Sequence, residues 1–378
     1  MKKGFFVLTA LLLISAMSVS VSAAGINGTP VIILKCDDYK SNNAASIENF
    51  EKLFDLLQKE KVTASFGIVG NSSKSGNQEA FWENTKKYIG SGIEIWSHGW
   101  LHRKNDEGVA EFNGMLTYEE MKSNFRQVID LVAKNTDGYQ ISSFGAPYNA
   151  TSSECLQMIQ QDFPQIKAIF FTSKEPATDA VRLTNSMKIE SGTGVASYDT
   201  FISSYNENLD YAVIQSHPGS FSDNSREEYR SMIQFLKNKK SIFMTATQYA
   251  NYTKDLAAYR SYPEEKIAVL CYNKLVQFDT LPFIEDGRTL IPVRAVAESF
   301  GTFVAWNEAE QKVTIIGNVD DVVLTIGEST AYIGDKAVTL DVPAKVVNGR
   351  TMVPLRFVAE AFGAEVLWDA ALNMAIIK

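Results

Sequence analysis

The chain has 378 residues, of which 45% are hydrophobic and 21% are charged, and its formal net charge at pH 7 is −8. A chain of this length and composition is expected to fold into two or three globular domains, which excludes large-scale disorder. Its acidic balance, without a basic cluster, argues against nucleic acid and anionic lipid as partners.

Residues 1–24 have the pattern of a secretory signal peptide. Lys2 and Lys3 precede the apolar run FFVLTALLLI, which leads into the small residues SVSVSAAG, with cleavage expected after Ala23 or Ala24. The apolar run is too short and too weakly flanked to favour the alternative, a retained membrane anchor. We therefore expect a secreted, extracellular protein that can associate with the cell wall.

The three cysteines, Cys36, Cys155 and Cys271, are far apart in the sequence, and none belongs to a C-x-x-C pair. In an exported protein this spacing does not indicate a disulfide scaffold or a thiolate metal site. Buried or free thiols are the expectation.

Residues 29–254 alternate short apolar strands, such as VIILKC, with amphipathic helices, such as IENFEKLFDLLQKE. Thr117 and Glu120 form a capping box that marks the start of a further helix over MKSNFRQVIDLV. Repeated strand–helix units predict a parallel sheet covered by helices. With this many units, we expect the sheet to close into a deformed (β/α) barrel.

The composition changes after residue 254. Residues 255–266 are polar and contain a proline, which favours a linker. An internal repeat follows, DGRTLIPVRAVAESFGTFVAW from Asp286 and NGRTMVPLRFVAEAFGAEVLW from Asn348, so its two copies are 62 positions apart. Repeats at a fixed offset indicate duplicated structural units. The chain is thus expected to divide into a signal peptide, a first domain over 25–254, a linker over 255–266, and a small α+β domain with two repeats over 267–378.

This repeat resembles the copper amine oxidase N-terminal domain, an appendage common on exported proteins of Gram-positive bacteria. The region has no histidine and its one cysteine is Cys271, so we expect no copper site there. The resemblance implies contact with the cell wall. A purely structural appendage is the alternative.

The stretch IEIWSHGWLH contains His98 and His102, two of the three histidines in the chain. Two imidazoles at this spacing can point to one side of a helical turn, and neutral imidazole is a good ligand for zinc and similar ions. The spacing alone leaves two interpretations open, a metal-ligand pair and a coincidence on the surface.

Other polar residues also follow apolar strands. Asp37 and Asp38 follow the strand VIILKC, Pro147 and Tyr148 follow ISSFGA, and His217 follows YAVIQS. The carboxyl ends of parallel strands gather on one face of a barrel, so these residues and the two other histidines are expected to share one site. Two histidines and one carboxylate leave metal positions open for water and substrate, while a second carboxylate can act as a base and a third histidine as an acid.

At these motifs the chain resembles the polysaccharide deacetylases of carbohydrate esterase family 4, also called the NodB-homology domain. The residues that carry the resemblance are KCDDY, IEIWSHGWLH, FGAPYN and VIQSHP, in the family's order. The resemblance implies that Asp38, His98 and His102 bind a divalent metal, with zinc expected first.

The resemblance also implies roles for the remaining motif residues. Asp37 would be the general base and His217 the general acid, and the loop of Pro147 and Tyr148 would face the oxyanion and substrate through the Tyr148 backbone N–H. The family usually has an arginine in its third motif that orients the base, and SSFGAPYN offers none. The acidic partner of the acid histidine is also not evident, with Asp210 as a weak candidate.

These observations predict a secreted metal-dependent hydrolase that removes N-acetyl groups from an amino-sugar polysaccharide of the cell wall or another extracellular glycan. Two alternatives remain. One is a weak or inactive glycan-binding protein on a deacetylase scaffold, which the missing arginine favours. The other is an O-acetyl esterase that uses the same site. The chain has no G-x-S-x-G elbow of a serine hydrolase.

Overall fold

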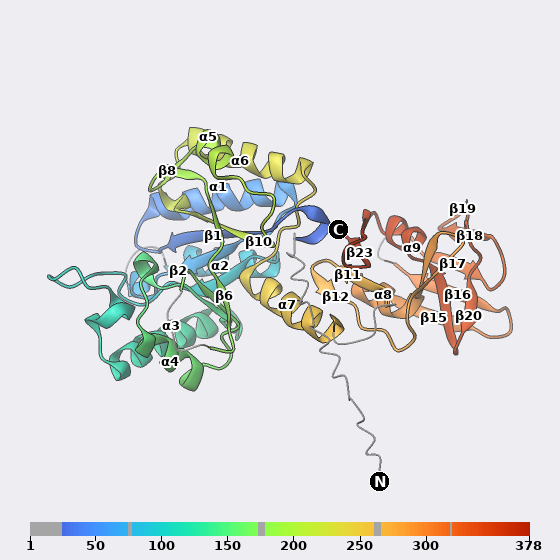
Figure 1. Cartoon of the computed structure of the whole chain (residues 1–378), viewed down its shortest axis with the longest axis horizontal. Coiled ribbons are helices and arrows are strands. Elements are labelled where there is room, and N and C mark those ends of the chain that lie inside the picture. The colour runs from blue at the N-terminus through green and yellow to red at the C-terminus, as the bar shows by residue number, and fades with distance from the viewer. Residues whose placement is uncertain (1–24, 75–77, 173–177, 261–265, 318–319) are drawn as a thin grey trace, which may run out of the picture.

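The computed structural model describes residues 25–74, 78–172, 178–260, 266–317 and 320–378. The expected signal peptide therefore lies outside the described residues. Within those ranges, no helix combines the length and the apolar character that crossing a membrane requires. Figure 1 shows a larger body of helices and strands from the first part of the chain, next to a smaller, strand-rich body formed by its C-terminal part.

An eight-stranded sheet forms the centre of the larger body, and every neighbouring pair in it is parallel. Its order is β6-β5-β4-β3-β2-β1-β10-β7. These strands are β1 (Val31–Tyr39), β2 (Ser65–Ile68), β3 (Glu94–Ser97), β4 (Ser143–Phe144), β5 (Ala168–Phe170), β6 (Val181–Leu183), β7 (Ser186–Lys188) and β10 (Tyr211–Ser216). Strand β1 is almost wholly buried, as expected for a central parallel strand with both faces covered.

One short segment closes this sheet. Strands β6 and β7 occupy opposite edges, yet only Thr184 and Asn185 separate them in the chain. The segment pairs with β5 through its first half and with β10 through its second half. The two edges therefore meet, and the predicted deformed (β/α) barrel is confirmed.

Helices surround the sheet, with α1 and α6 on one side and α3 and α4 on the other in Figure 1. The helices of this body are α1 (Ala44–Glu60), α2 (Gln78–Gly90), α3 (Tyr118–Asn135), α4 (Ser153–Asp162), α5 (Tyr198–Ser204), α6 (Asp223–Asn238) and α7 (Ala246–Arg260), with short turns η1 (Ile26–Gly28), η2 (Gly70–Lys74), η3 (Glu111–Met115), η4 (Pro147–Asn149) and η5 (Pro218–Ser220). The capping box of Thr117 and Glu120 is present at the start of α3. An isolated parallel bridge joins Ile32 of β1 to Phe243, just before α7.

The C-terminal body contains the two repeats as equivalent sets of elements. The first set is β13 (Phe283–Glu285), β14 (Arg288–Pro292), α8 (Val293–Ser299), β15 (Phe303–Asn307) and β16 (Lys312–Ile316). The second is β20 (Lys345–Val347), β21 (Arg350–Pro354), α9 (Leu355–Ala361), β22 (Val366–Asp369) and β23 (Met374–Ile377). The remaining strands are β11 (Ala268–Cys271), β12 (Lys274–Leu275), β17 (Val322–Thr325), β18 (Thr330–Ile333) and β19 (Lys336–Thr339), while β8 (Glu190–Gly192) and β9 (Val195–Ala196) form a hairpin in the larger body.

The two repeats are related by a pseudo-twofold axis. Strands β14 and β21 pair antiparallel with Ile291 opposite Val353, which are equivalent positions of the two copies. Each repeat opens with a tight hairpin turn whose glycine, Gly287 or Gly349, has a φ of +72° or +73°. Only glycine adopts this backbone conformation readily, which explains the repeated D/N-G pair in the sequence.

The two bodies share a hydrophobic cluster, and the expected linker is partly helical. Helix α7 continues through residues 255–260, and residues 261–265 lie outside the described residues. The shared cluster includes residues at the start of β1 and β10, residues of α7 and residues of the C-terminal body. The members from the second repeat are Leu367, Met374 and Ile376. The equivalent residues of the first repeat are Ala305, Lys312 and Thr314, none of them buried. The repeats thus differ at the positions that face the barrel.

Candidate metal centre and active site

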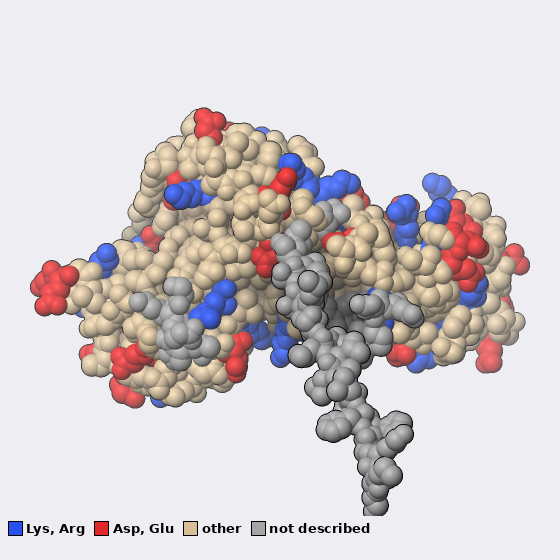
Figure 2. All heavy atoms as spheres, viewed as in Figure 1, with Lys and Arg blue, Asp and Glu red and all other residues tan. Residues whose placement is uncertain are grey.

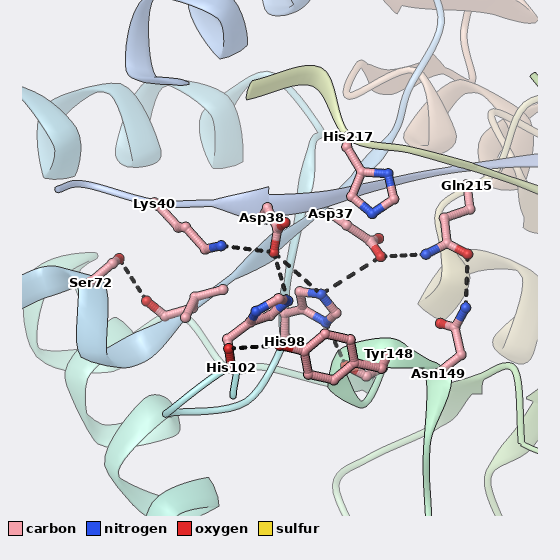
Figure 3. A network of polar contacts seen from close by, with 12 residues as sticks. Asp37, Asp38, Lys40, Ser72, His98, His102, Tyr148, Asn149, Gln215 and His217 are labelled. Atoms are coloured by element: carbon pink, nitrogen blue, oxygen red, sulfur yellow. Dashed lines mark hydrogen bonds and ion pairs between the residues drawn. The ribbon is translucent and has the colours of Figure 1, made fainter. Parts of the chain in front are cut away.

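Three of the sequence-predicted residues lie together at the carboxyl ends of the sheet strands. Asp38 is the eighth residue of β1, His98 follows β3 directly, and His102 lies in the loop beyond it. One ligand atom from each lies within 4.8 Å of those of the other two. Asp38 Oδ1 is 2.9 Å from His102 Nε2 and 3.6 Å from His98 Nε2 (Figure 3). Such a set of two imidazoles and one carboxylate is typical of a catalytic metal site.

Hydrogen bonds from outside the cluster fix both histidines. His98 Nδ1 lies 2.8 Å from the carbonyl oxygen of Gly145, so this nitrogen is the donor and Nε2 is left to face Asp38. The buried carboxylate of Glu111 accepts hydrogen bonds from the backbone N–H groups of Trp100, Leu101 and His102 at 2.9–3.0 Å. The loop that presents His102 is therefore held in place by a single buried side chain.

The charge states of the three residues suit a cation. Asp38 Oδ1 is buried and makes no hydrogen bond of acceptable geometry, although both imidazoles point towards it. Burial alone would raise the pKa of Asp38, but the approach of His102 and the charge of His98 hold it well below the usual range. Burial lowers the pKa of His98 to about 4, which favours the neutral, ligating form. The residues present therefore fit a divalent ion.

The second carboxylate of the motif, Asp37, is bound to a lysine inside the barrel. Lys35 Nζ lies 2.6 Å and 2.5 Å from the two carboxylate oxygens of Asp37, and Gln215 Nε2 donates to Oδ2 at 2.7 Å. Both members of the ion pair are buried, with side chains 0% and 2% exposed. The carboxylate of Asp37 is thus held from two sides, next to His98 Nε2 at 3.7 Å.

Lys35 reaches Asp37 because residues i and i+2 of a strand point to the same face of the sheet. Its ammonium group lies 4.8 Å from the ring of Trp96 and 5.5 Å from that of Phe170, which are cation–π distances. Burial lowers the pKa of Lys35, and the charge of Asp37 partly offsets this effect. The Pro-Tyr loop supplies no cation, and at Gly145 a Cβ would lie 2.7 Å from Trp96.

His217 follows β10 and has an acidic partner. Its Nδ1 is 2.7 Å from Glu190 Oε2, and its backbone N–H donates to Oε1 of the same carboxylate at 2.6 Å. Burial lowers the pKa of His217, but the hydrogen bond to Glu190 and the charge of Asp37 outweigh burial and raise it above its ordinary value. Asp210, the candidate from the sequence, instead bonds Asn185 and the backbone of Tyr211 at the start of β10.

A cleft of about 520 Å³ opens beside His217. Its lining includes Glu190, Gln215 and Asn149, and Asn149 Nδ2 donates to Gln215 Oε1 at 3.0 Å. Tyr148 lies at the rim of the centre, with its ring 5.1 Å from that of His102. Its φ of +61° is unusual, and its backbone N–H makes no hydrogen bond to any described residue.

Two protein-family models match the chain. Residues 25–162 match the polysaccharide deacetylase model, and residues 271–377 match the copper amine oxidase N-terminal domain model. The chain carries a polysaccharide deacetylase domain. It is followed by a copper amine oxidase N-terminal domain. The deacetylase match includes Asp37, Asp38, His98, His102 and the Pro-Tyr loop, and it ends before His217.

This chain is also similar to several solved structures, but only at low sequence identity. A family 4 acetyl xylan esterase from Clostridium thermocellum, solved with a cobalt ion, is 15% identical, with a TM-score of 0.43 over 62% of this chain and 93% of that one. A peptidoglycan deacetylase from Bacillus subtilis is 16% identical, with a TM-score of 0.42 over 62% and 96%. A CE4 family pseudoenzyme from Bacillus anthracis is 14% identical, with a TM-score of 0.43 over 59% and 66%. Comparison with curated proteins finds no match.

Three residues of the candidate site were not predicted from the sequence. The sequence did contain an indication of Lys35. It is the one charged residue in the stretch VIILKC, and it lies two positions before Asp37, so both side chains point to the same face of the sheet. Glu190 lies in a stretch of short, irregular strands and is 27 positions from His217, so no periodicity pointed to it. Glu111 belongs to the irregular turn η3. Its partners in the His102 loop are backbone N–H groups, which do not depend on residue type and so cannot be recognised in a sequence.

Proposed function

We propose that the chain is a secreted, metal-dependent hydrolase that removes N-acetyl groups from an amino-sugar polysaccharide, either a cell-wall or another extracellular glycan. One observation carries this proposal. The cluster of Asp38, His98 and His102 lies beside the buried carboxylate of Asp37, and His217, which is hydrogen-bonded to a glutamate, lies at the same site. The family model supports hydrolysis of acetylated polysaccharide as the class of reaction.

Asp38, His98 and His102 are proposed to hold the ion, with zinc expected first from the donor set. A divalent ion bound there would lower the pKa of its water and polarise the acetyl carbonyl. Lys40 Nζ, 3.2 Å from Asp38 Oδ1, is a cation close to the same carboxylate. Binding of the ion therefore has to displace this contact.

Asp37 is proposed to remove the proton from the attacking water. Lys35 and Gln215 fix the orientation of its carboxylate, so no side-chain entropy is lost when the reaction begins. In this proposal Lys35 is a positioning residue that does the work of the arginine usual in the family. The proposed general base then has the cationic partner that orients it, which favours an enzyme over an inactive glycan-binding protein.

His217 is proposed to donate the proton that the departing amine needs. Glu190 accepts from Nδ1, which leaves Nε2 as the atom that can face the substrate, and it favours the imidazolium form that a general acid requires. The backbone N–H of Tyr148 is proposed to stabilise the oxyanion that develops on the acetyl group. Figure 3 shows His217 across the two aspartates from the ring of Tyr148.

The test measures acetate release from short N-acetylglucosamine oligomers and from peptidoglycan, with the metal content of the same samples. An Asp37→Asn variant should keep its metal and lose about 10²-fold in turnover. Asp210→Asn, a carboxylate at the opposite end of β10 from His217, is the matched control and should keep full activity. Metal-loaded protein that releases no acetate from any of these glycans would contradict the proposal.

A further inference from the structure

The C-terminal domain contains two hollows of about 270 and 310 Å³ that are lined by equivalent residues. Each is built from both repeats, because the start of one helix and the strand pair after it meet the hairpin turn of the other copy. Ten lining residues of the first hollow each have their counterpart 62 positions away in the second. The pseudo-twofold axis therefore duplicates one surface feature.

Both hollows expose aromatic and aliphatic surface. Trp306 in the first and Trp368 in the second are 41% and 39% exposed. The three tryptophans of the deacetylase domain are at most 8% exposed. Val346 and Ile284, another equivalent pair on the hairpins, are 49% and 57% exposed. Exposure of the same large apolar residues in both copies indicates a surface that has a ligand.

Two arginines line each hollow, and one of the two carries an uncompensated charge. In the first hollow Arg350 pairs with Asp279 at 2.5 Å, whereas Arg294 is exposed. In the second hollow the equivalent Arg288 pairs with Asp341 at 2.6 Å, and the exposed residue is Arg356. Within the described ranges neither Arg294 nor Arg356 has a carboxylate at ion-pair distance. In a chain of net charge −8, a free cation at both equivalent places favours an anionic ligand.

We propose that the two hollows are equivalent binding sites for an acidic polysaccharide that carries carboxylates. The flat face of a sugar ring can stack on Trp306 or Trp368, and the planar guanidinium of Arg294 or Arg356 matches a carboxylate. The domain is then a bivalent polysaccharide receptor. This binding is separate from the proposed deacetylase chemistry, because none of the lining residues belongs to the metal centre.

The test is calorimetric titration of the full-length protein with a short oligomer of galacturonic acid, followed by binding to insoluble polygalacturonate. The expected stoichiometry is two oligomers per chain. Trp306→Ala and Trp368→Ala should each remove one of the two, with the dissociation constant of the remaining site unchanged. Either change should weaken binding to the insoluble polymer at least 10-fold, because a bivalent attachment becomes monovalent.

Phe303→Ala is the matched control, since Phe303 lies on the same strand as Trp306, is 76% exposed and lines neither hollow. It should bind like the wild type. Equal binding of a neutral oligomer of N-acetylglucosamine, or binding of polyphosphate but not of the uronate, would refute the assignment of a carboxylated ligand. A dimer at concentrations where Trp306→Ala is monomeric would show that a second copy of the chain fills the hollow, which also overturns the proposal.

Discussion

Replacing Lys35 by methionine removes the cation that holds Asp37 and leaves a side chain of similar length inside the barrel. Lys35 and Asp37 are 0% and 2% exposed, so the variant leaves a buried carboxylate without its counter-charge. Losing one partner of a buried ion pair typically costs about 3–5 kcal/mol. We expect the lower end, about 3 kcal/mol, because Gln215 still donates to Asp37 Oδ2.

The same change should lower turnover by about 10²-fold, since a base that is free to rotate no longer meets the attacking water in one orientation. Metal content should stay near that of the wild type, because Lys35 does not contact the three side chains proposed to bind metal in the described part of the chain. Denaturant unfolding gives the stability, and acetate release and elemental analysis give the other two quantities.

A double variant decides whether the pair acts as a unit. Lys35→Met combined with Asp37→Asn removes both charges, and buried pairs replaced in this way usually lose little stability. The double variant should therefore be more stable than Lys35→Met alone, while remaining inactive. If the two changes simply add in stability, or if Lys35→Met keeps its turnover with metal bound, the positioning role of Lys35 is wrong.

Four further variants test the site and the domain contact. Joint His98→Ala and His102→Ala changes should abolish metal binding in elemental analysis and leave the circular dichroism spectrum unchanged; retained metal would place the ion elsewhere. Glu190 raises the pKa of His217, so Glu190→Gln should move the basic limb of the pH–rate profile to lower pH, and an unmoved limb would separate Glu190 from catalysis. His217→Ala should slow acetate release from an amide more than from an activated aryl acetate, and equal losses would end its assignment as general acid. Leu367→Ala should destabilise the whole chain by about 2–5 kcal/mol in denaturant unfolding, whereas a negligible effect would mean that the two domains do not fold as one unit.

The positions of the residues proposed to bind metal could be predicted because they follow from topology. Strands that are apolar on both faces predict a parallel sheet, and parallel strands bring residues far apart in the sequence to one edge. Asp38 lies near the end of β1 and His98 directly follows β3, and only β2 lies between these two strands in the sheet. His102 lies in the short loop after His98. The meeting of Asp38 and His98 therefore follows from the strand order, whereas the position of His102 also depends on the loop that Glu111 holds.

The partners of the proposed catalytic residues could not be predicted in the same way. The contact of His217 with Glu190 depends on the path of the segment from β7 to β9, which has neither helical nor strand periodicity. The sequence predicts a linker at residues 255–266, but the first half of this stretch belongs to α7, because Tyr249 and Tyr252 bury that helix against both domains. Such tertiary burial leaves no local pattern in composition.

The two domains meet at the end of the barrel that lies away from the candidate active site. The C-terminal domain packs against the start of β1, and the two aspartates lie near its other end, six residues or about 20 Å further along the strand. The proposed polysaccharide sites of the C-terminal domain and the proposed deacetylase site therefore lie on two domains that meet at the start of β1, away from the aspartates. If both sites bind glycan, this contact sets the distance between the segment that is held and the segment that is deacetylated. The pattern of deacetylation would then depend on that distance as well as on the sugars that the cleft accepts.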